Sequence, residues 1–144
     1  MRESTQMLPR DTSPVDLYPE YNISVPVDHF HNDSAYEPHS DASFNLRYWF
    51  DASHYQPGGP VIVVQSGETN GKNRIPVLRK GIAAQLAQAT GGLAVILEHR
   101  YYGKSIPVPD LTTKSLRFLT TDQALADMAY FARKVVFDGL EHLD

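Results

Sequence analysis

The stretch PVIVVQSGE at residues 60–68 decides the fold class of this 144-residue chain. It begins with a continuous apolar run rich in β-branched residues, and a second apolar run, LAVIL, follows at residues 93–97. Continuous apolar strands are typical of parallel sheets, in which both faces of the sheet are covered. We therefore predict two buried parallel strands joined by a right-handed crossover connection.

The connection between these two strands is predicted to be a helix over residues 76–90. Apolar side chains recur there with helical spacing at Leu78, Ile82 and Leu86, and the pair GG at residues 91–92 provides a stop signal. This spacing predicts one helix whose apolar stripe faces the sheet.

A second helix is predicted to begin at Thr120. Thr120 and Gln123 form a capping box, which satisfies backbone N–H groups in the first turn of a helix. Its apolar stripe, which we expect to lie in the core, consists of Leu125, Met128, Ala129, Ala132, Val135 and Val136.

Two segments nearer the amino terminus alternate between apolar and polar residues. In the first, Val25, Val27 and His29 share one face of a predicted strand, and the proline between the two valines suits the edge of a sheet. The second segment covers residues 43–50 and alternates more regularly. We expect the two to pair antiparallel through the polar connection at residues 31–41. The predicted fold class is α/β: an antiparallel hairpin followed by parallel strands with crossover helices.

Composition and charge exclude several classes of partner. With 42% hydrophobic residues the chain can bury a core as one domain, and its net charge of −4 argues against nucleic acid or an anionic membrane as the main partner. Cysteine is absent, which excludes disulfides, thiolate zinc sites and a cysteine nucleophile. The apolar runs are too short to cross a bilayer, and no pattern indicates a cofactor.

The first candidate functional loop follows the strand at residues 60–65, because ligands of open α/β sheets bind beyond the carboxyl ends of the strands. A phosphate-binding loop has the pattern G-x-x-x-x-G-K-[ST]. Here Gly67 and Gly71 are one residue too close together, and Asn73 stands where the pattern needs a hydroxyl residue. Ser66 lacks the flanking glycines of a nucleophile elbow. The loop does offer backbone N–H groups at Gly67 and Glu68, where an oxyanion could be received.

The second candidate loop, residues 98–105, is richer in reactive side chains. Glu98, His99, Arg100 and Tyr101 are the candidates for an active-site face. The alternative is an internal Glu–Arg ion pair with tyrosines packed over it. Structural ion pairs of this kind are the commoner case, so the residues alone favour the structural interpretation.

Histidines provide a third candidate site. His29 and His31 would lie on one face of the predicted strand and could bind a metal ion with nearby side chains. The spacing is generic, so we favour a surface or interface cluster and predict no metal site. The nearby side chains are Asp28, Asp33, His39 and Asp41.

Two N-glycosylation triplets begin at Asn22 and Asn32. Residues 1–14 are polar and lack the apolar segment of a signal peptide. If the triplets are used, we expect a secretion signal to be missing from this chain.

Five sequence blocks occur in an order that resembles one family of peptidases. They are VDHF at residues 27–30, SFNLRYW at 43–49, GPVIVVQSGE at 59–68, EHRYYGKS at 98–105 and LTTDQALAD at 119–127. Over residues 25–137 the chain is similar to the serine carboxypeptidase family that includes lysosomal Pro-X carboxypeptidase, dipeptidyl peptidase II and the fungal prolyl endopeptidases.

This resemblance implies an α/β-hydrolase fold with an inserted helical lid, and cleavage of peptides next to proline by a Ser, Asp and His triad. The hairpin would supply the first two strands, and the runs at residues 60–65 and 93–97 the third and fourth. The family's Gly-Gly-Glu loop matches Ser66-Gly67-Glu68, with a departure at the first glycine. A secreted, vacuolar or lysosomal location is also implied.

No triad residue can be assigned in this chain, because the family's nucleophile, acid and histidine lie beyond the position that matches Asp144. We therefore expect residues 1–22 to be a polar extension and residues 23–144 a partial α/β-hydrolase domain that is inactive alone. A non-catalytic peptide-binding module is the alternative. Without a fifth strand, the strand at residues 61–64 would have an unpaired edge, and we expect self-association there.

Overall fold

The computed structural model describes residues 18–140, so the predictions for residues 1–17 and 141–144 lie outside the described part. The strands are β1 (Tyr21–Pro26), β2 (Ser43–Asp51), β3 (Val61–Gln65) and β4 (Leu93–Leu97), and the helices are α2 (Pro76–Arg79), α3 (Ile82–Thr90) and α4 (Thr121–Lys134). Short 3-10 helices lie in the connections: η2 (Ser34–Tyr36), η3 (Gly71–Arg74) and η4 (Ser115–Phe118). Within residues 18–140, no helix has the length and apolar character needed to span a bilayer.

The four strands form one mixed sheet in the order β1-β2-β4-β3. β1 and β2 pair antiparallel with Val25 opposite Phe44, which confirms the predicted hairpin. β3 and β4 pair parallel with Val63 opposite Val95, which confirms the predicted parallel pair. β2 joins the two pairs by running antiparallel to β4. The α/β class predicted from the sequence is therefore confirmed for the described residues.

β1 lies earlier in the chain than predicted. It ends at Pro26, at the edge of the sheet, so His29 lies outside the strand. The chain turns at Asp28, whose carboxylate accepts hydrogen bonds from Phe30 N and from the Gln123 side chain, each at 2.9 Å. Such side-chain bonds compete with extended structure, and an alternation pattern does not reveal them.

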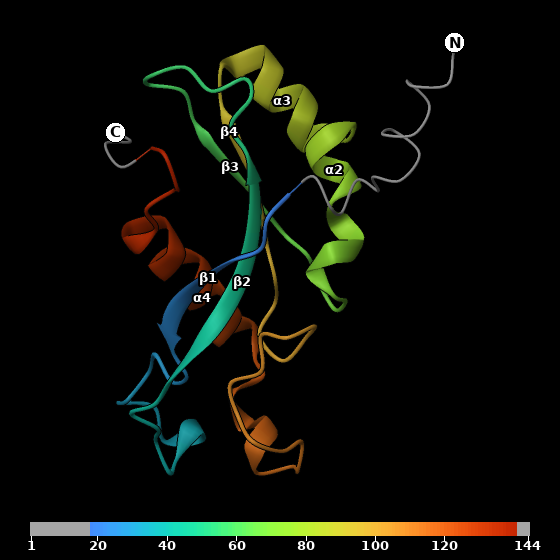
Figure 1. Ribbon diagram of the computed structural model, residues 1–144. Coiled ribbons are helices and arrows are strands. Elements are labelled where there is room, and N and C mark those ends of the chain that lie inside the picture. The colour runs from blue at the N-terminus through green and yellow to red at the C-terminus, as the bar shows by residue number, and fades with distance from the viewer. Residues whose placement is uncertain (1–17, 141–144) are drawn as a thin grey trace.

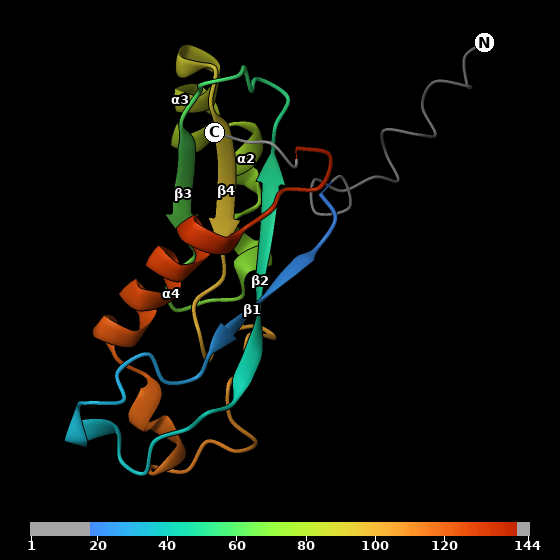
Figure 2. The ribbon, with the colours of Figure 1, turned by 90° about the vertical axis from the view of Figure 1, so that its left-hand side faces the viewer.

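Helices cover both faces of the sheet, with α2 and α3 on one side and α4 on the other (Figures 1 and 2). β4 serves both layers. Leu93, Val95 and Leu97 belong to the core on the α4 side, whereas Ala94 and Ile96 belong to the core under α2 and α3. All five residues of β4 are buried, as predicted for a strand that is covered on both faces.

The predicted helix over residues 76–90 is divided into α2 and α3. Lys80 leaves helical geometry with a φ of −133°. A Cβ at Gly81 would lie 2.8 Å from Val77 Cα, so this close approach requires glycine. The predicted stop is confirmed, because Gly91 ends α3 in the left-handed conformation with a φ of 67°.

The break between α2 and α3 changes which side chains are buried. Leu78 is buried as predicted, but Ile82 and Leu86 are exposed. Ala83 and Ala87 take the buried positions instead. Because the helix is interrupted at Lys80 and Gly81, the apolar positions predicted for one continuous helix no longer face the sheet after the break.

α4 begins as predicted but presents a different face to the core. Thr120 is its N-cap, and Thr120 Oγ1 accepts a hydrogen bond from Gln123 N at 3.2 Å. Met128 and Val135 are partly buried, whereas the other residues of the predicted stripe are exposed: Leu125, Ala129, Ala132 and Val136. The buried residues of α4 are Gln123, Ala124, Asp127 and Phe131. Two of these are polar, which explains why hydrophobicity alone placed the buried face wrongly.

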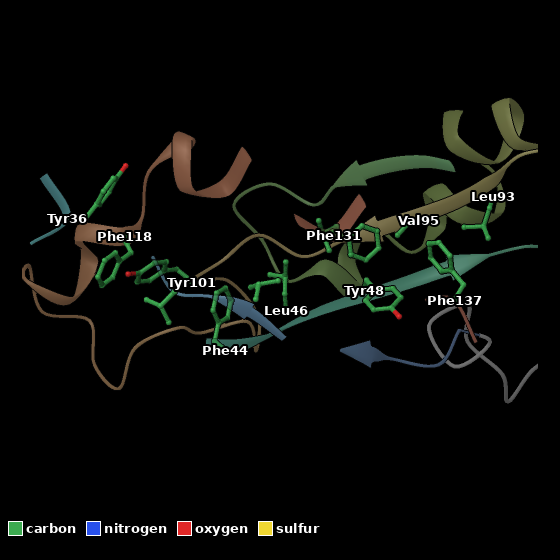
Figure 3. Close-up of a cluster of buried hydrophobic side chains, with 13 residues drawn as sticks. Tyr36, Phe44, Leu46, Tyr48, Leu93, Val95, Tyr101, Phe118, Phe131 and Phe137 are labelled. Atoms are coloured by element: carbon green, nitrogen blue, oxygen red, sulfur yellow. The ribbon is translucent and has the colours of Figure 1, made fainter. Parts of the chain in front are cut away.

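Aromatic side chains fill the core between α4 and the sheet (Figure 3). The ring of Phe131 meets Tyr48 edge-on, with ring centroids 5.0 Å apart. Phe137 meets Phe50 edge-on at 5.0 Å. Edge-to-face contacts add to the free energy of burying these large rings, so they hold α4 and the residue Phe137 that follows it against β2.

β3 is less buried than predicted. Val61 is exposed, and the other four residues of the strand are only partly buried. Within residues 18–140, β3 pairs with β4 alone, so its second edge faces no strand of the described part. A groove of about 310 Å³ lies beside it, lined by Val61, Val63, Phe131, Ala132, Arg133, Val135 and Phe137.

Candidate active-site surface

The two predicted loops meet at one end of the sheet. β3 and β4 end together, with Gln65 opposite Leu97, as Figure 2 shows. Beyond the strands, Ser66 N donates to Leu97 O at 2.9 Å, and His99 N donates to Ser66 Oγ at 3.3 Å. The carboxyl ends of the parallel strands thus bring the loops after β3 and β4 into one surface.

A hollow of about 200 Å³ opens on this surface, lined by Glu68, His99, Tyr102, Leu119, Thr120 and Thr121. Tyr102 Oη donates to Glu68 Oε2 at 2.9 Å, and the rings of His99 and Tyr102 meet edge-on at 5.3 Å. The hydrogen bond to Glu68 raises the pKa of Tyr102, assisted by burial and by the charge of the carboxylate. Tyr102 is therefore a neutral donor at neutral pH.

The backbone of the first loop carries two N–H groups that have no acceptor among the described residues. Gly67 has a φ of 76°, in the left-handed region that favours glycine. Within residues 18–140, neither Gly67 N nor Glu68 N donates a hydrogen bond to a protein atom. Backbone donors of this kind can stabilise an oxyanion. That role was predicted from the sequence for both groups, and it stays a prediction.

Glu98 is fully buried, and both oxygens of its carboxylate accept hydrogen bonds. Arg47 donates to both oxygens of its carboxylate, from Nε and from Nη2, each at 2.7 Å. Gly71 N and Ser105 Oγ also donate to it, each at 2.7 Å. Burial alone would raise the pKa of Glu98, but the hydrogen bonds from Arg47, Gly71 and Ser105 outweigh burial and lower it. Glu98 is thus an ionised structural group inside the protein.

Arg100 is also fully buried, and it pairs with Asp127. Its Nε and Nη2 donate to the Asp127 carboxylate at 2.7 and 2.8 Å, and Nη1 donates to Val27 O at 2.8 Å. The structural interpretation of Glu98 and Arg100 is therefore supported, but the predicted pairing between them is wrong. They belong to two separate buried pairs, one with Arg47 and one with Asp127.

Of the four candidates in the second loop, His99 is the one that lines the hollow. Tyr101 is buried, has a φ of 74°, and donates from Oη to Ser115 O at 2.6 Å. Burial raises the pKa of Tyr101. The left-handed conformation at Tyr101 reverses the chain, so the next residue, Tyr102, faces the hollow.

Arg47 and Asp127 support this surface, and neither was singled out from the sequence. Arg47 is a charged residue between Leu46 and Tyr48 in the middle of β2, and Asp127 lies between Ala126 and Met128 of α4. An isolated charge inside a predicted buried element is the signal that could have found them, because such a charge needs a partner.

The predicted histidine pair is wrong, because His29 and His31 do not share a strand face. His29 Nε2 lies 2.7 Å from Asp127 Oδ1. His39 Nδ1 lies 2.6 Å from Asp28 Oδ2, and the rings of His31 and His39 stack with centroids 5.3 Å apart. His39, from the connection between β1 and β2, therefore takes the place beside His31 that was predicted for His29.

Comparison with known proteins gives a family match over most of the chain. The model of the family described as serine carboxypeptidase S28 matches residues 26–140. The chain is 64% identical over 124 residues to a protein named probable extracellular serine carboxypeptidase, from Arthroderma benhamiae. That alignment covers 86% of this chain and 17% of the relative.

Two further relatives come from animals. The chain is 41% identical over 87 residues to the human thymus-specific serine protease, covering 60% of this chain and 16% of that protein. It is 33% identical over 115 residues to prolyl carboxy peptidase like protein 5 of Caenorhabditis elegans, covering 78% and 21%. The chain thus spans about a fifth or less of the length of these relatives.

Proposed function

Because this chain belongs to the serine carboxypeptidase S28 family, we propose that it forms part of the peptide-binding face of a serine peptidase. The observation that carries the proposal is the hollow beyond β3 and β4, with Glu68, His99 and Tyr102 in its lining. The backbone N–H groups of Gly67 and Glu68 supply donors for the oxyanion that forms during acyl transfer.

The same chemistry requires a serine, a histidine and an acid that act as a unit. Ser66 is buried, and its Oγ accepts from His99 N at 3.3 Å. Ser105 is buried, and its Oγ donates to Glu98 at 2.7 Å. Both loop serines are therefore structural, and we expect this chain to supply binding and polarising groups but no nucleophile.

The proposed substrates are peptides, cleaved next to proline in the manner of an exopeptidase or carboxypeptidase. The order of the five sequence blocks supports this class of substrate, as does the name of the Caenorhabditis elegans relative. The hollow offers a carboxylate, a phenol and an imidazole, which are groups that can hydrogen-bond to a peptide.

A fluorophosphonate probe, which labels activated serines, tests the division of roles. The purified 144-residue chain should stay unlabelled and should leave proline-containing peptides intact, because its loop serines are buried. An active serine peptidase in the same assay is the positive control. Labelling of Ser66, Ser105 or any other serine would contradict the proposal.

Sequencing the messenger RNA that encodes the chain is a separate test of the proposed peptidase role. We expect an open reading frame beyond the codon for Asp144 that encodes Gly-x-Ser-x-Gly within a few tens of residues. In the protein so encoded, Tyr102→Phe should lower kcat/KM by up to about tenfold, since one hydrogen bond at the hollow is lost. Thr113→Ala, at an exposed position, is the control and should leave kcat/KM unchanged.

A stop codon directly after Asp144 would contradict this role. Saturable binding of a proline-containing peptide to the folded monomer would then favour the alternative, a non-catalytic peptide-binding module.

A secreted, vacuolar or lysosomal location is part of the proposal. The name of the Arthroderma benhamiae relative supports it. Asn22 lies on the edge strand β1 and Asn32 in the turn after it, and both are exposed and so accessible for glycosylation. Treating the protein from its natural source with an N-glycosidase should lower its apparent mass. An unchanged mass would remove this support.

A further inference from the structure

Three side chains outside the hollow converge on one point. Asp28, His31 and His39 each offer a ligand atom, and these atoms lie within 4.8 Å of one another. All three belong to the connection between β1 and β2, so a single segment of chain carries them. His39 Nδ1 is 2.6 Å from Asp28 Oδ2, and the His31 ring stacks on the His39 ring at an interplanar angle of 20°.

The carboxylate of Asp28 is held in a fixed orientation. Its Oδ1 accepts both Phe30 N and Gln123 Nε2, each at 2.9 Å. Its Oδ2 is therefore the oxygen that faces the histidines. Asp28 is 1% exposed and forms the buried, rigid end of the cluster. The hydrogen bond from Gln123 connects Asp28 to α4.

The exposed fraction of the side chain increases from Asp28 through His39 to His31. The side chain of His39 is 21% exposed, and that of His31 is 47% exposed. Asp41 Oδ1 lies 3.8 Å from His31 Nδ1 at the outer end. The cluster thus combines a buried anionic group with an imidazole that can move and that solvent can reach.

We propose that Asp28, His31 and His39 bind a zinc ion. Imidazole nitrogens and a carboxylate oxygen are typical zinc ligands, with bond lengths of about 2.0–2.2 Å and a tetrahedral arrangement. Ligand atoms of such a site lie about 3.3 Å apart. The ligand atoms here lie up to 4.8 Å apart, so His31, which is half exposed, must move closer to the other two ligands when zinc binds. Water occupies the fourth coordination position.

Zinc would bind in place of the hydrogen bond between His39 Nδ1 and Asp28 Oδ2. The ion would cross-link both ends of the segment from Asp28 to His39, which connects β1 and β2. The hydrogen bond from Gln123 to Asp28 would join this segment to α4. This role is structural and independent of the proposed peptidase chemistry, since none of the three residues lines the hollow.

Metal content measured after dialysis tests the proposal. The 144-residue chain is loaded with Zn²⁺ and then dialysed against a weak chelator. We expect about one zinc per chain to remain on the native protein and almost none on His31→Ala. His54→Ala, at an exposed position outside the cluster, is the matched control and should retain zinc as the native chain does.

The affinity for zinc should fall in His31→Ala by more than the roughly 10- to 100-fold that loss of an outer-shell partner costs. Because His31 is half exposed, this variant should keep the native circular dichroism spectrum. A zinc-dependent rise in the unfolding midpoint should occur in the native chain and in His54→Ala but not in His31→Ala. Equal zinc content in the native chain and His31→Ala, or no retained zinc at all, would overturn the proposal.

Discussion

Glu98 and Arg100 are two positions apart in the sequence and belong to different buried ion pairs. Glu98 joins β4 to β2 through Arg47, whereas Arg100 joins the loop after β4 to α4 through Asp127. Each pair is surrounded by further hydrogen bonds, which is the condition under which a buried charge is tolerated. These residues therefore position the hollow, and the groups that face it are Glu68, His99 and Tyr102.

Replacing Arg47 by Met should lower the free energy of unfolding by about 3–5 kcal/mol, because Glu98 would stay buried without its partner. Denaturant titration followed by circular dichroism measures the change. Lys114→Ala, at an exposed position before η4, is the control and should change the same quantity by less than about 0.5 kcal/mol. Equal destabilisation by the two variants would contradict the assigned role of the Arg47–Glu98 pair.

The lowered pKa values of Asp28 and Glu98 predict a fold that is sensitive to acid. A carboxyl group with a lowered pKa binds its proton more weakly in the folded chain than in the unfolded chain. Its contribution to stability is present above the unfolded pKa of about 4 and is lost as the pH falls through the lower, folded value. Unfolding midpoints in urea should therefore decline mainly below about pH 5.

Glu98→Gln tests this dependence, because the amide does not titrate. The variant should be less stable at neutral pH, since Arg47 loses one of its two anionic partners and keeps only Glu20, but its decline toward acid pH should be shallower. A decline as steep as that of the native chain would show that Glu98 does not contribute to the acid sensitivity.

Among the elements, α4 shows how polar side chains orient a helix. Gln123 faces inward because its side chain donates to Asp28, and Asp127 faces inward because it accepts from Arg100. These contacts set the rotation of the helix about its axis and leave Leu125 56% exposed. The apolar pattern alone predicted the opposite for Leu125.

Two truncations in α4 distinguish the observed face from the predicted one. Phe131→Ala should cost about 3–5 kcal/mol of stability, because the ring is fully buried against Tyr48. Leu125→Ala should cost less than about 0.5 kcal/mol. Denaturant midpoints of both variants provide the measurement, and a larger loss for Leu125→Ala would restore the face predicted from the sequence.

For the whole molecule, β3 is the feature that governs association. It is an apolar strand with an open edge within the described residues, next to an apolar groove. An edge of this kind pairs readily with strands of other chains. Self-association through β3 therefore stays a prediction that the architecture supports.

Light scattering during gel filtration should show species larger than a monomer for the 144-residue chain, increasing with concentration. Val61→Lys places a charge on the exposed start of β3 and should shift the distribution toward monomer. Thr113→Lys adds the same charge at an exposed loop position and should not. A monomeric preparation that melts sharply would contradict both self-association and the expectation of a partial domain.

The sequence by itself determined the features that depend on neighbouring residues. The hairpin, the parallel pair, the cap at Thr120 and the stop at Gly91 were predictable because strand period, capping and glycine conformation are local properties. The place of the loops after β3 and β4 followed from the same elements, and the order of the sequence blocks indicated the family.

The tertiary structure alone decided which polar groups are buried and with which partners. Arg47 is 51 residues from Glu98, and the His29 ring meets Asp127 across 98 residues. A buried charge is favourable only when a partner from another element compensates its loss of water, and no local pattern specifies that partner. For this reason the rotation of α4, the ion pairs behind the hollow and the position of His39, rather than His29, beside His31 were decided only in the folded chain.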